Sequence, residues 1–526
     1  MQSFKRTAPK AIFPWSMRTF LNTGTLAATS ASTPVTSNSS TLVNNSTLGF
    51  LYSKQRFFSA TSTEDSIDSN IPKLPILWDM ADTAKKAGIG DLSKIAVIGV
   101  QHMLPTTGSL IDVMIDGLNI NPKNMYFTGK FYSSCPGTEE YIKKRGVSLM
   151  RTKIPRKPAQ YREQMLETVG DMWDLFQEKI NNNGIDAIAI FDEGGYLLES
   201  MPKSVRYKYR CSVIEQTTFG LHSHAVGSQL FPLIDVAKSV AKKQLESPLI
   251  ATAILQRVEE IVVELKLKQN TIFGVIGNGS IGSAITQHLL SHGFTVVIYD
   301  ESDSAFHGII NRNCYRVDNI KKVIAGANVV FSCTGKDVTR NVDIFDIVND
   351  PITLISCSSQ DIEFQSFLTK MSRRVTLHFN ENATHITCSS NSGHDIKILN
   401  NGFPINFDKT AKSDPPQDMQ LTRALLLGGL IQGATEATKP VNDGYTLNKS
   451  AHHMLNPYIQ QFVVNRWQHS QPEGRYSKEL LDCFNNIAWI KKNSSGEYKD
   501  NPLLGAGFSD DLSIEQEQEK LPVPQF

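Results

Sequence analysis

The most informative stretch of the 526-residue sequence reads Asn270-Thr-Ile-Phe-Gly-Val-Ile-Gly-Asn-Gly-Ser-Ile-Gly-Ser-Ala284, and Phe294-Thr-Val-Val-Ile-Tyr-Asp300 follows it. An apolar run enters a Gly-x-Gly-x-x-Gly motif, a helical pattern continues to His292, and a second apolar run ends in an acid. The motif is weak alone, but a strand before it and a helix after it are the setting in which it binds dinucleotides. We predict such a βαβ unit, with a glycine-rich turn that binds nothing as the alternative.

The residues of this unit have separate expected roles. Gly277 permits a tight turn, Gly279 lets a pyrophosphate approach the start of the helix, and Gly282 allows the helix to pack closely on the strand. Asp300 is expected to accept hydrogen bonds from the adenosine ribose and to repel a 2′-phosphate, which favours NAD over NADP. The remaining predicted cofactor-binding residues of the motif are Asn278, Ser280 and Ile281.

Further runs of strand length flank this unit. Residues 327–335 and 353–359 follow it, and residues 94–103, 125–128 and 185–195 precede it. Strands alternating with helices predict an α/β fold with doubly wound parallel sheets. We expect a two-lobed chain in which the NAD-binding Rossmann domain is inserted in a second, substrate-type α/β domain. Thr334 and Gly335, at the tip of one predicted strand, are further expected cofactor contacts.

The domain boundaries follow from these patterns. We expect a Rossmann domain over residues 263–417 and a substrate-type domain over 71–262 and 418–526, which ends in helices. Residues 1–70 are expected to be a disordered leader, because Met1 to Thr63 contain six basic residues, no acid and many Ser, Thr and Asn residues. That composition is typical of a mitochondrial transit peptide, although a tail without an address, in a cytoplasmic protein, is the alternative.

The charge balance excludes some partners. The chain has 53 Lys and Arg against 52 Asp and Glu, so its formal net charge is +1. Without the six basic residues of the leader, the chain has 47 basic residues against 52 acidic ones, a net charge of −5. We therefore expect no nucleic-acid partner and no membrane partner. The seven cysteines are scattered without metal-ligand spacing, so we expect no metal site and no disulfide framework.

Several stretches together resemble the S-adenosylhomocysteine hydrolase family. They occur in the family's order and comprise His102-Met103, Phe191-Asp-Glu-Gly-Gly195, Glu215-Gln-Thr-Thr-Phe-Gly-Leu-His222, the glycine motif, Ser332-Cys-Thr-Gly335 and Leu399-Asn-Asn-Gly-Phe-Pro-Ile-Asn406. The resemblance implies an enzyme with tightly bound NAD that oxidises a ribose hydroxyl transiently, eliminates homocysteine and returns the hydride. It also implies an adenosine-containing small-molecule ligand, and we expect a homo-oligomer or a hetero-oligomer with a homologue.

The resemblance assigns roles to individual residues. Lys242 matches the family's catalytic lysine and His102 an active-site histidine, while Glu193 and Glu246 match acids that position ribose hydroxyls. Thr217, Thr218 and Asn406 match positions that contact NAD. Other readings remain open: Lys242 and Glu246 also fit an exposed helix turn, His102 a core histidine, and Glu193 a turn acid.

The sequence departs from the family at several of these positions. Glu193 and Glu246 stand for aspartates, Gln216 for a glutamate and Ser359 for a catalytic histidine. Three hypotheses follow: an adenosylhomocysteinase-like hydrolase of one-carbon metabolism, a catalytically inactive NAD-binding regulator that associates with an active homologue, or a 2-hydroxyacid dehydrogenase-like oxidoreductase. The last needs an Arg, an acid and a His around the nicotinamide, and no convincing set stands out in the sequence.

Overall fold

The structure is a computed structural model. It describes residues 71–153, 160–180, 184–224, 231–262, 270–306, 311–358, 361–374, 385–407, 413, 415–438, 452–471, 474 and 476–493. The predicted leader and Ser359 therefore lie outside the described residues. Within them, no helix is both long enough and apolar enough to cross a membrane.

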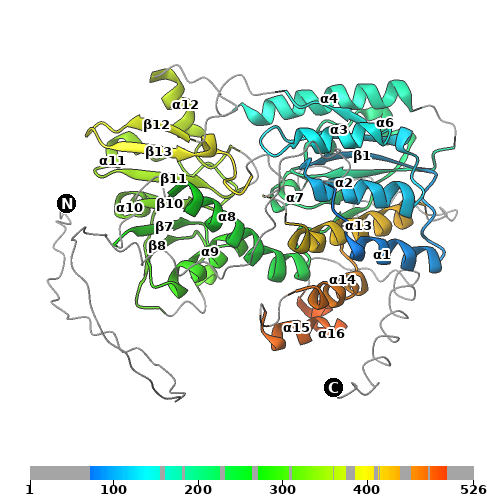
Figure 1. Ribbon diagram of the computed structural model, residues 1–526. Coiled ribbons are helices and arrows are strands. Elements are labelled where there is room, and N and C mark those ends of the chain that lie inside the picture. The colour runs from blue at the N-terminus through cyan, green and yellow to red at the C-terminus, as the bar shows by residue number, and fades with distance from the viewer. Residues whose placement is uncertain are drawn as a thin grey trace, which may run out of the picture. The chain divides into compact units, whose positions relative to one another are not determined.

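The first sheet, which contains the strand labelled β1 in Figure 1, has seven strands in the order β14-β6-β5-β4-β1-β2-β3, and all neighbouring strands are parallel. Its strands are β1 (Ile95–Gln101), β2 (Met125–Gly129), β3 (Ser148–Met150), β4 (Ala187–Asp192), β5 (Arg210–Glu215), β6 (Leu233–Asp235) and β14 (His452–Met454). The central strands are buried along their whole length, as expected for parallel strands covered by helices on both faces.

The second sheet also has seven strands, in the order β12-β13-β11-β10-β7-β8-β9, and only the β12–β13 pair is antiparallel. Its strands are β7 (Ile272–Ile276), β8 (Thr295–Tyr299), β9 (Cys314–Arg316), β10 (Val329–Ser332), β11 (Ile352–Ser356), β12 (His385–Ser389) and β13 (Asp395–Leu399). Strands β8 and β9 lie on one side of β7, and β10, β11 and β13 lie on the other, so the chain order reverses between β7 and β10. This is the doubly wound arrangement that the glycine motif predicted.

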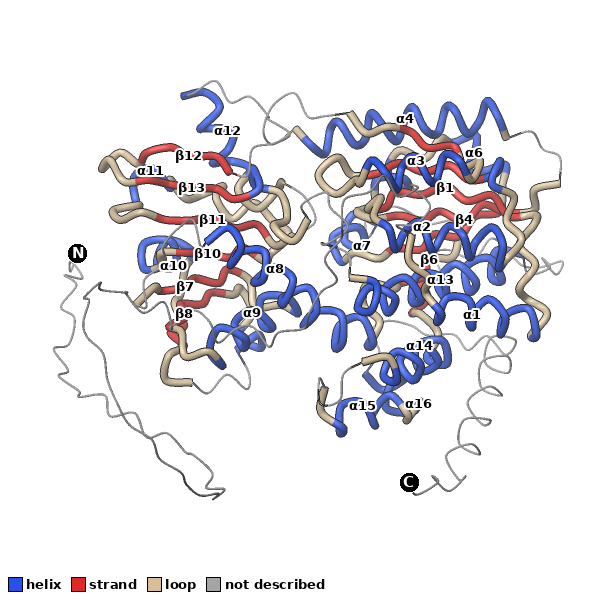
Figure 2. The backbone as a smooth tube through the Cα atoms, in the orientation of Figure 1, coloured by secondary structure: helices blue, strands red, loops and turns tan. Residues whose placement is uncertain are grey.

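Helices cover both faces of the sheets (Figure 2). Around the first sheet lie α1 (Pro75–Lys86), α2 (Pro105–Asp112), α3 (Pro136–Lys144), α4 (Tyr161–Lys179), α5 (Tyr196–Glu199), α6 (Lys203–Lys208), α7 (Thr218–His224) and α13 (Pro416–Thr438). The others are α8 (Ser247–Val262), α9 (Ser280–Ser291), α10 (Ile320–Gly326), α11 (Ile344–Ile347), α12 (Gln365–Arg374), α14 (Pro457–His469), α15 (Lys478–Phe484) and α16 (Ile487–Asn493).

Alternate side chains of β1 enter two different cores. Val97 packs in the core that contains α1 and α13, whereas Ile98 packs in the core that contains α4. Helix α13 lies against β4, β5 and β6, so the chain returns to the first sheet after it has completed the second one. The predicted fold class is therefore confirmed, including the insertion of the Rossmann sheet within the other α/β unit.

Candidate active site

Three polar side chains follow three neighbouring strands of the first sheet. His102 comes after β1, Lys130 after β2 and Glu193 after β4. These strands are adjacent in the order β4-β1-β2 and are in parallel register. Because the carboxyl ends of parallel strands meet at one edge of a sheet, residues far apart in the sequence are brought together there.

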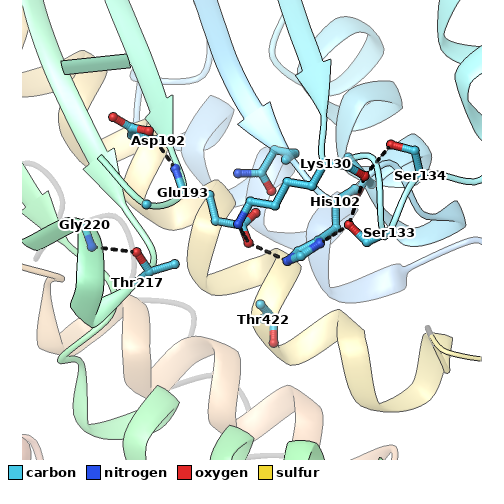
Figure 3. Close-up of polar contacts among 12 residues, drawn as sticks. His102, Lys130, Ser133, Ser134, Asp192, Glu193, Thr217, Gly220 and Thr422 are labelled. Carbon is cyan, nitrogen blue, oxygen red and sulfur yellow. Dashed lines mark hydrogen bonds and ion pairs between the residues drawn. The ribbon is translucent and has the colours of Figure 1, made fainter. Parts of the chain in front are cut away.

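The three side chains form one cluster (Figure 3), in which Lys130 and Glu193 are buried and His102 is 12% exposed. His102 Nε2 lies 2.5 Å from Glu193 Oε1, and Lys130 Nζ lies 2.7 Å from the same oxygen. The side chain of Lys130 is fully buried and that of Glu193 is 3% exposed. The second carboxylate oxygen, Glu193 Oε2, is buried and has no hydrogen-bond partner among the described residues. His102 therefore lies among charged and polar groups, and its role in catalysis stays a prediction.

The protonation states follow from burial and charge. Burial lowers the pKa of His102 to about 4, and the positive charges of Lys130 and Arg423 act in the same direction against the pull of Glu193. Burial alone would raise the pKa of Glu193, but His102 and Lys130 hold it well below its usual range. At neutral pH the imidazole is uncharged and the carboxylate is ionised.

The hydrogen bonds then fix the imidazole tautomer. An ionised carboxylate only accepts, so Nε2 of His102 carries the proton that Glu193 binds. The Ser133 hydroxyl is hydrogen-bonded to Nδ1 of His102 and must donate to it. On one face of the imidazole, the Phe407 ring stacks at 4.1 Å between centroids. Phe407 belongs to the segment that follows β13, so a part of the Rossmann unit contacts His102.

The predicted Lys242–Glu246 pair forms in a buried setting. Both residues lie in a single π-helical turn (Lys242–Glu246) that runs into α8, and their side chains are 15% and 7% exposed. Lys242 contacts Glu246 Oε2, and the Thr422 hydroxyl donates to Glu246 Oε1 at 2.6 Å. The exposed-turn reading of this pair is thus wrong. The next residue of α13, Arg423, donates to Thr106 at 2.9 Å.

The glycine motif fits a dinucleotide. A Cβ on Gly282 would lie 1.9 Å from the Gly277 carbonyl oxygen, so the start of α9 can pack this closely only with glycine there. Gly279 and Ser280 are exposed, and no side chain caps the start of α9. The amide oxygen of Asn278 is buried and has no hydrogen-bond partner among the described residues. The first backbone N–H groups of a helix have no partner within it, so the uncapped start of α9 suits a pyrophosphate. Ile281 packs partly into the core instead.

Asp300 occupies the position expected of a ribose-binding acid at the end of β8. Its Oδ2 accepts from the Asn278 backbone N–H at 2.6 Å, and its Oδ1 accepts from the Ser302 N–H at 2.8 Å. These two bonds orient the carboxylate beside the glycine turn, and the side chain stays partly exposed. The arrangement fits NAD.

Other predicted cofactor contacts are engaged by internal carboxylates. Glu363 is fully buried and accepts from the backbone N–H groups of Thr334 and Gly335, each at 2.7 Å. Likewise, Glu215 accepts from the backbone N–H of Thr217 at 2.7 Å. Thr218, the first residue of α7, is exposed, and Asn406 is partly buried beside Phe407. Their contact with a cofactor stays a prediction.

Three residues of the site were not predicted: Lys130, Ser133 and Glu363. Lys130 and Ser133 lie in a loop whose sequence carries no motif. Their position after β2, next to β1 in the sheet, is the one signal that points to them. Glu363 follows β11 by seven residues and pairs with the tip of β10. The number of residues between a strand tip and a carboxylate that binds it is not fixed, so one sequence alone does not reveal that Glu363 binds Thr334.

Comparison with known proteins identifies the cofactor domain. Residues 272–379 match the family model described as the NAD binding domain of 6-phosphogluconate dehydrogenase. The second sheet belongs to an NAD-binding domain. The predicted cofactor, NAD, and the Rossmann fold are thereby confirmed.

Two uncharacterized proteins of Mycobacterium tuberculosis, from strains CDC 1551 / Oshkosh and ATCC 25618 / H37Rv, are each 25% identical over 347 residues. The match covers 65% of this chain and 64% of each relative, so the chain spans less than two thirds of their length.

Solved structures with some likeness are dehydrogenases. An NAD+-bound 3-phosphoglycerate dehydrogenase of Entamoeba histolytica is 10% identical, with a TM-score of 0.34 over 68% of this chain and 99% of that one. A 2-hydroxyacid dehydrogenase of Ketogulonicigenium vulgare Y25 is 14% identical, with a TM-score of 0.23 over 47% of this chain and 77% of that one. Scores this low carry no weight for function.

The expected membership of the S-adenosylhomocysteine hydrolase family is wrong. The family model that matches the glycine motif and the strands after it comes from a dehydrogenase. The short stretches that suggested the hydrolase are turns and strand ends, which many NAD-binding proteins need for the same physical reasons. The hydrolase activity and the link to one-carbon metabolism lose their basis with it.

Proposed function

We propose that this protein is an NAD-dependent dehydrogenase that oxidises the hydroxyl group of a small hydroxy acid. The observation that carries the proposal is the uncharged His102, held by the ionised Glu193 and contacted by Phe407 from the NAD-binding unit. An alcohol dehydrogenation needs such a proton acceptor. NAD, when bound, supplies the hydride acceptor.

The chain's own residues have distinct tasks in this reaction. A polar group of the substrate that donates to Glu193 Oε2 would satisfy a buried oxygen that has no partner among the described residues. The hydroxyl that is oxidised would lie at the opposite, Nδ1 end of the imidazole, where it would give its proton to Ser133 Oγ while the Ser133 hydroxyl gives its own proton to Nδ1 of His102. Lys130 and Arg423 make the site positive, which favours a substrate with a carboxylate. Arg423, Glu193 and His102 are the residue types that a 2-hydroxyacid dehydrogenase needs, and their action on one another supports the proposal.

The proposal is tested with the purified full-length chain, NAD and a panel of 2-hydroxy acids, by following the absorbance of NADH. The variants are Glu193→Gln and, as a matched control, Glu140→Gln, whose exposed side chain pairs only with Lys144 among the described contacts. Loss of the hydrogen bonds to an ionised carboxylate should lower kcat/KM about 10²–10⁴-fold for Glu193→Gln and leave the control unchanged.

Two results would contradict the proposal. Equal rates for Glu193→Gln and wild type would remove the site from the reaction. Bound NAD without reduction by any hydroxy acid would instead favour the inactive NAD-binding regulator.

A further inference from the structure

Lys130 is fully buried and pairs with Glu193, and these surroundings indicate a role for it. We propose that Lys130 is a positioning residue that keeps the His102 imidazole uncharged by sharing Glu193 with it. The inference deepens the proposed function, because it explains how the proton acceptor of that reaction is kept ready. It can nevertheless be tested without any substrate.

Two nitrogen atoms share one carboxylate oxygen as their hydrogen-bond acceptor. Lys130 Nζ and His102 Nε2 both approach Glu193 Oε1, at 2.7 Å and 2.5 Å. A carboxylate carries one negative charge, and the fully buried ammonium group of Lys130 already balances it. A second positive charge on the imidazole would therefore lack a counterion in a region with little water.

Charged groups from three elements act on the pKa of His102. Glu193, after β4, attracts a proton to the imidazole, whereas Lys130, after β2, and Arg423, on α13, repel it. The Ser133 hydroxyl and the rings of Phe407 and Tyr132 also contact His102, and none of them is charged, since burial raises the pKa of Tyr132. Lys130 is the positive group that shares an oxygen with His102, so it dominates the repulsion.

The loop after β2 holds Lys130 in place. The Lys130 carbonyl accepts from the Ser133 N–H at 2.9 Å and from the Ser134 hydroxyl at 3.0 Å. The loop that supplies Ser133 to one imidazole nitrogen thus also supplies the ammonium group beside the other. Both contacts favour the same tautomer of the uncharged ring.

Removing the ammonium group should raise the pH at which His102 gains a proton, although the burial that also lowers its pKa stays in place. In Lys130→Met the buried Glu193 carboxylate would have His102 as its closest cationic partner, so the imidazole should gain a proton. We expect the titration midpoint of His102, followed by NMR of the labelled imidazole in the full-length chain, to rise by at least about two pH units. Lys130→Arg retains the charge and should keep the wild-type midpoint.

A second variant protects the test against misfolding. Glu193→Gln removes the attracting charge but leaves Lys130 in place, so the His102 midpoint should stay at or below the wild-type value. An unchanged midpoint in folded Lys130→Met, or a raised midpoint in Glu193→Gln, would overturn the proposal. The exposed substitution Lys123→Met serves as the control for both.

The midpoint separates this proposal from the proposed function. If the midpoint shifts as expected but no hydroxy acid is oxidised, the positioning role stands and the dehydrogenase does not. If oxidation occurs and the midpoint does not move, the reaction stands without this role for Lys130.

Discussion

At the scale of single residues, Asp300 should set the choice of cofactor. Its two oxygens are held by the N–H groups of Asn278 and Ser302, so its carboxylate is oriented before any ligand arrives. In Asp300→Ala the ribose would lose hydrogen bonds to a charged group, each worth about 1.5–3 kcal/mol. We expect the Kd for NAD to rise about ten- to a hundredfold and the preference over NADP to shrink.

Calorimetric titration with NAD and NADP measures both effects. Asp303→Ala is the matched control, because Asp303 is an exposed acid three residues away whose carboxylate pairs with Arg316. Should Asp300→Ala bind the two cofactors as the wild type does, Asp300 does not face the ribose.

The same scale shows what one sequence can reveal. Gly277 and Asp300 were predictable because a dinucleotide constrains the residues that surround it to a short, recognisable spacing. Lys130 was not, because its partner Glu193 is 63 residues away and only the strand order makes them neighbours. A lysine after a strand usually reaches water, and nothing local marks this one as fully buried.

At the scale of elements, strands with long apolar runs were predictable and marginal ones were not. Strands β1, β4, β7 and β10 are apolar because helices cover both faces of the parallel sheets. Strand β12 is half-exposed and antiparallel, so it lacks the apolar run of the central strands. The π-helical turn at Lys242–Glu246 also has no pattern in the sequence and exists through tertiary contacts.

Helix α13 should tolerate added volume poorly. A Cβ on Gly428 would lie 2.3 Å from the Ile459 Cγ2 atom of α14. Gly428→Ala should therefore lower the free energy of unfolding by about 1–3 kcal/mol through overpacking. Gly170→Ala, inside α4, is the control, because a Cβ there meets nothing within 4 Å.

The control should change stability in the opposite direction. Alanine in an unstrained helix interior gains about 0.5–1 kcal/mol over glycine. Thermal unfolding of the two variants gives the comparison. Equal midpoints would show that α13 and α14 separate easily enough to accept the methyl group.

At the scale of the whole molecule, the buried site makes stability depend on pH. The pKa of His102 is about 4 in the folded chain, against 6.5 for an ordinary histidine. Between these values the unfolded chain binds a proton that the folded chain does not, so stability falls as the pH drops through this window. The lowered pKa of Glu193 adds a loss in the same direction at lower pH.

The size of the effect follows from the same pKa values. A shift from 6.5 to about 4 corresponds to on the order of 3 kcal/mol once the pH has fallen below both. His102→Gln removes the titrating group, so its unfolding midpoint in urea should depend less on pH across this window than that of the wild type. His469→Gln, at an exposed position at the end of α14, should follow the wild type. Identical pH dependence in His102→Gln and wild type would mean that His102 is not buried uncharged, because a histidine that is already protonated in the folded chain contributes no such loss.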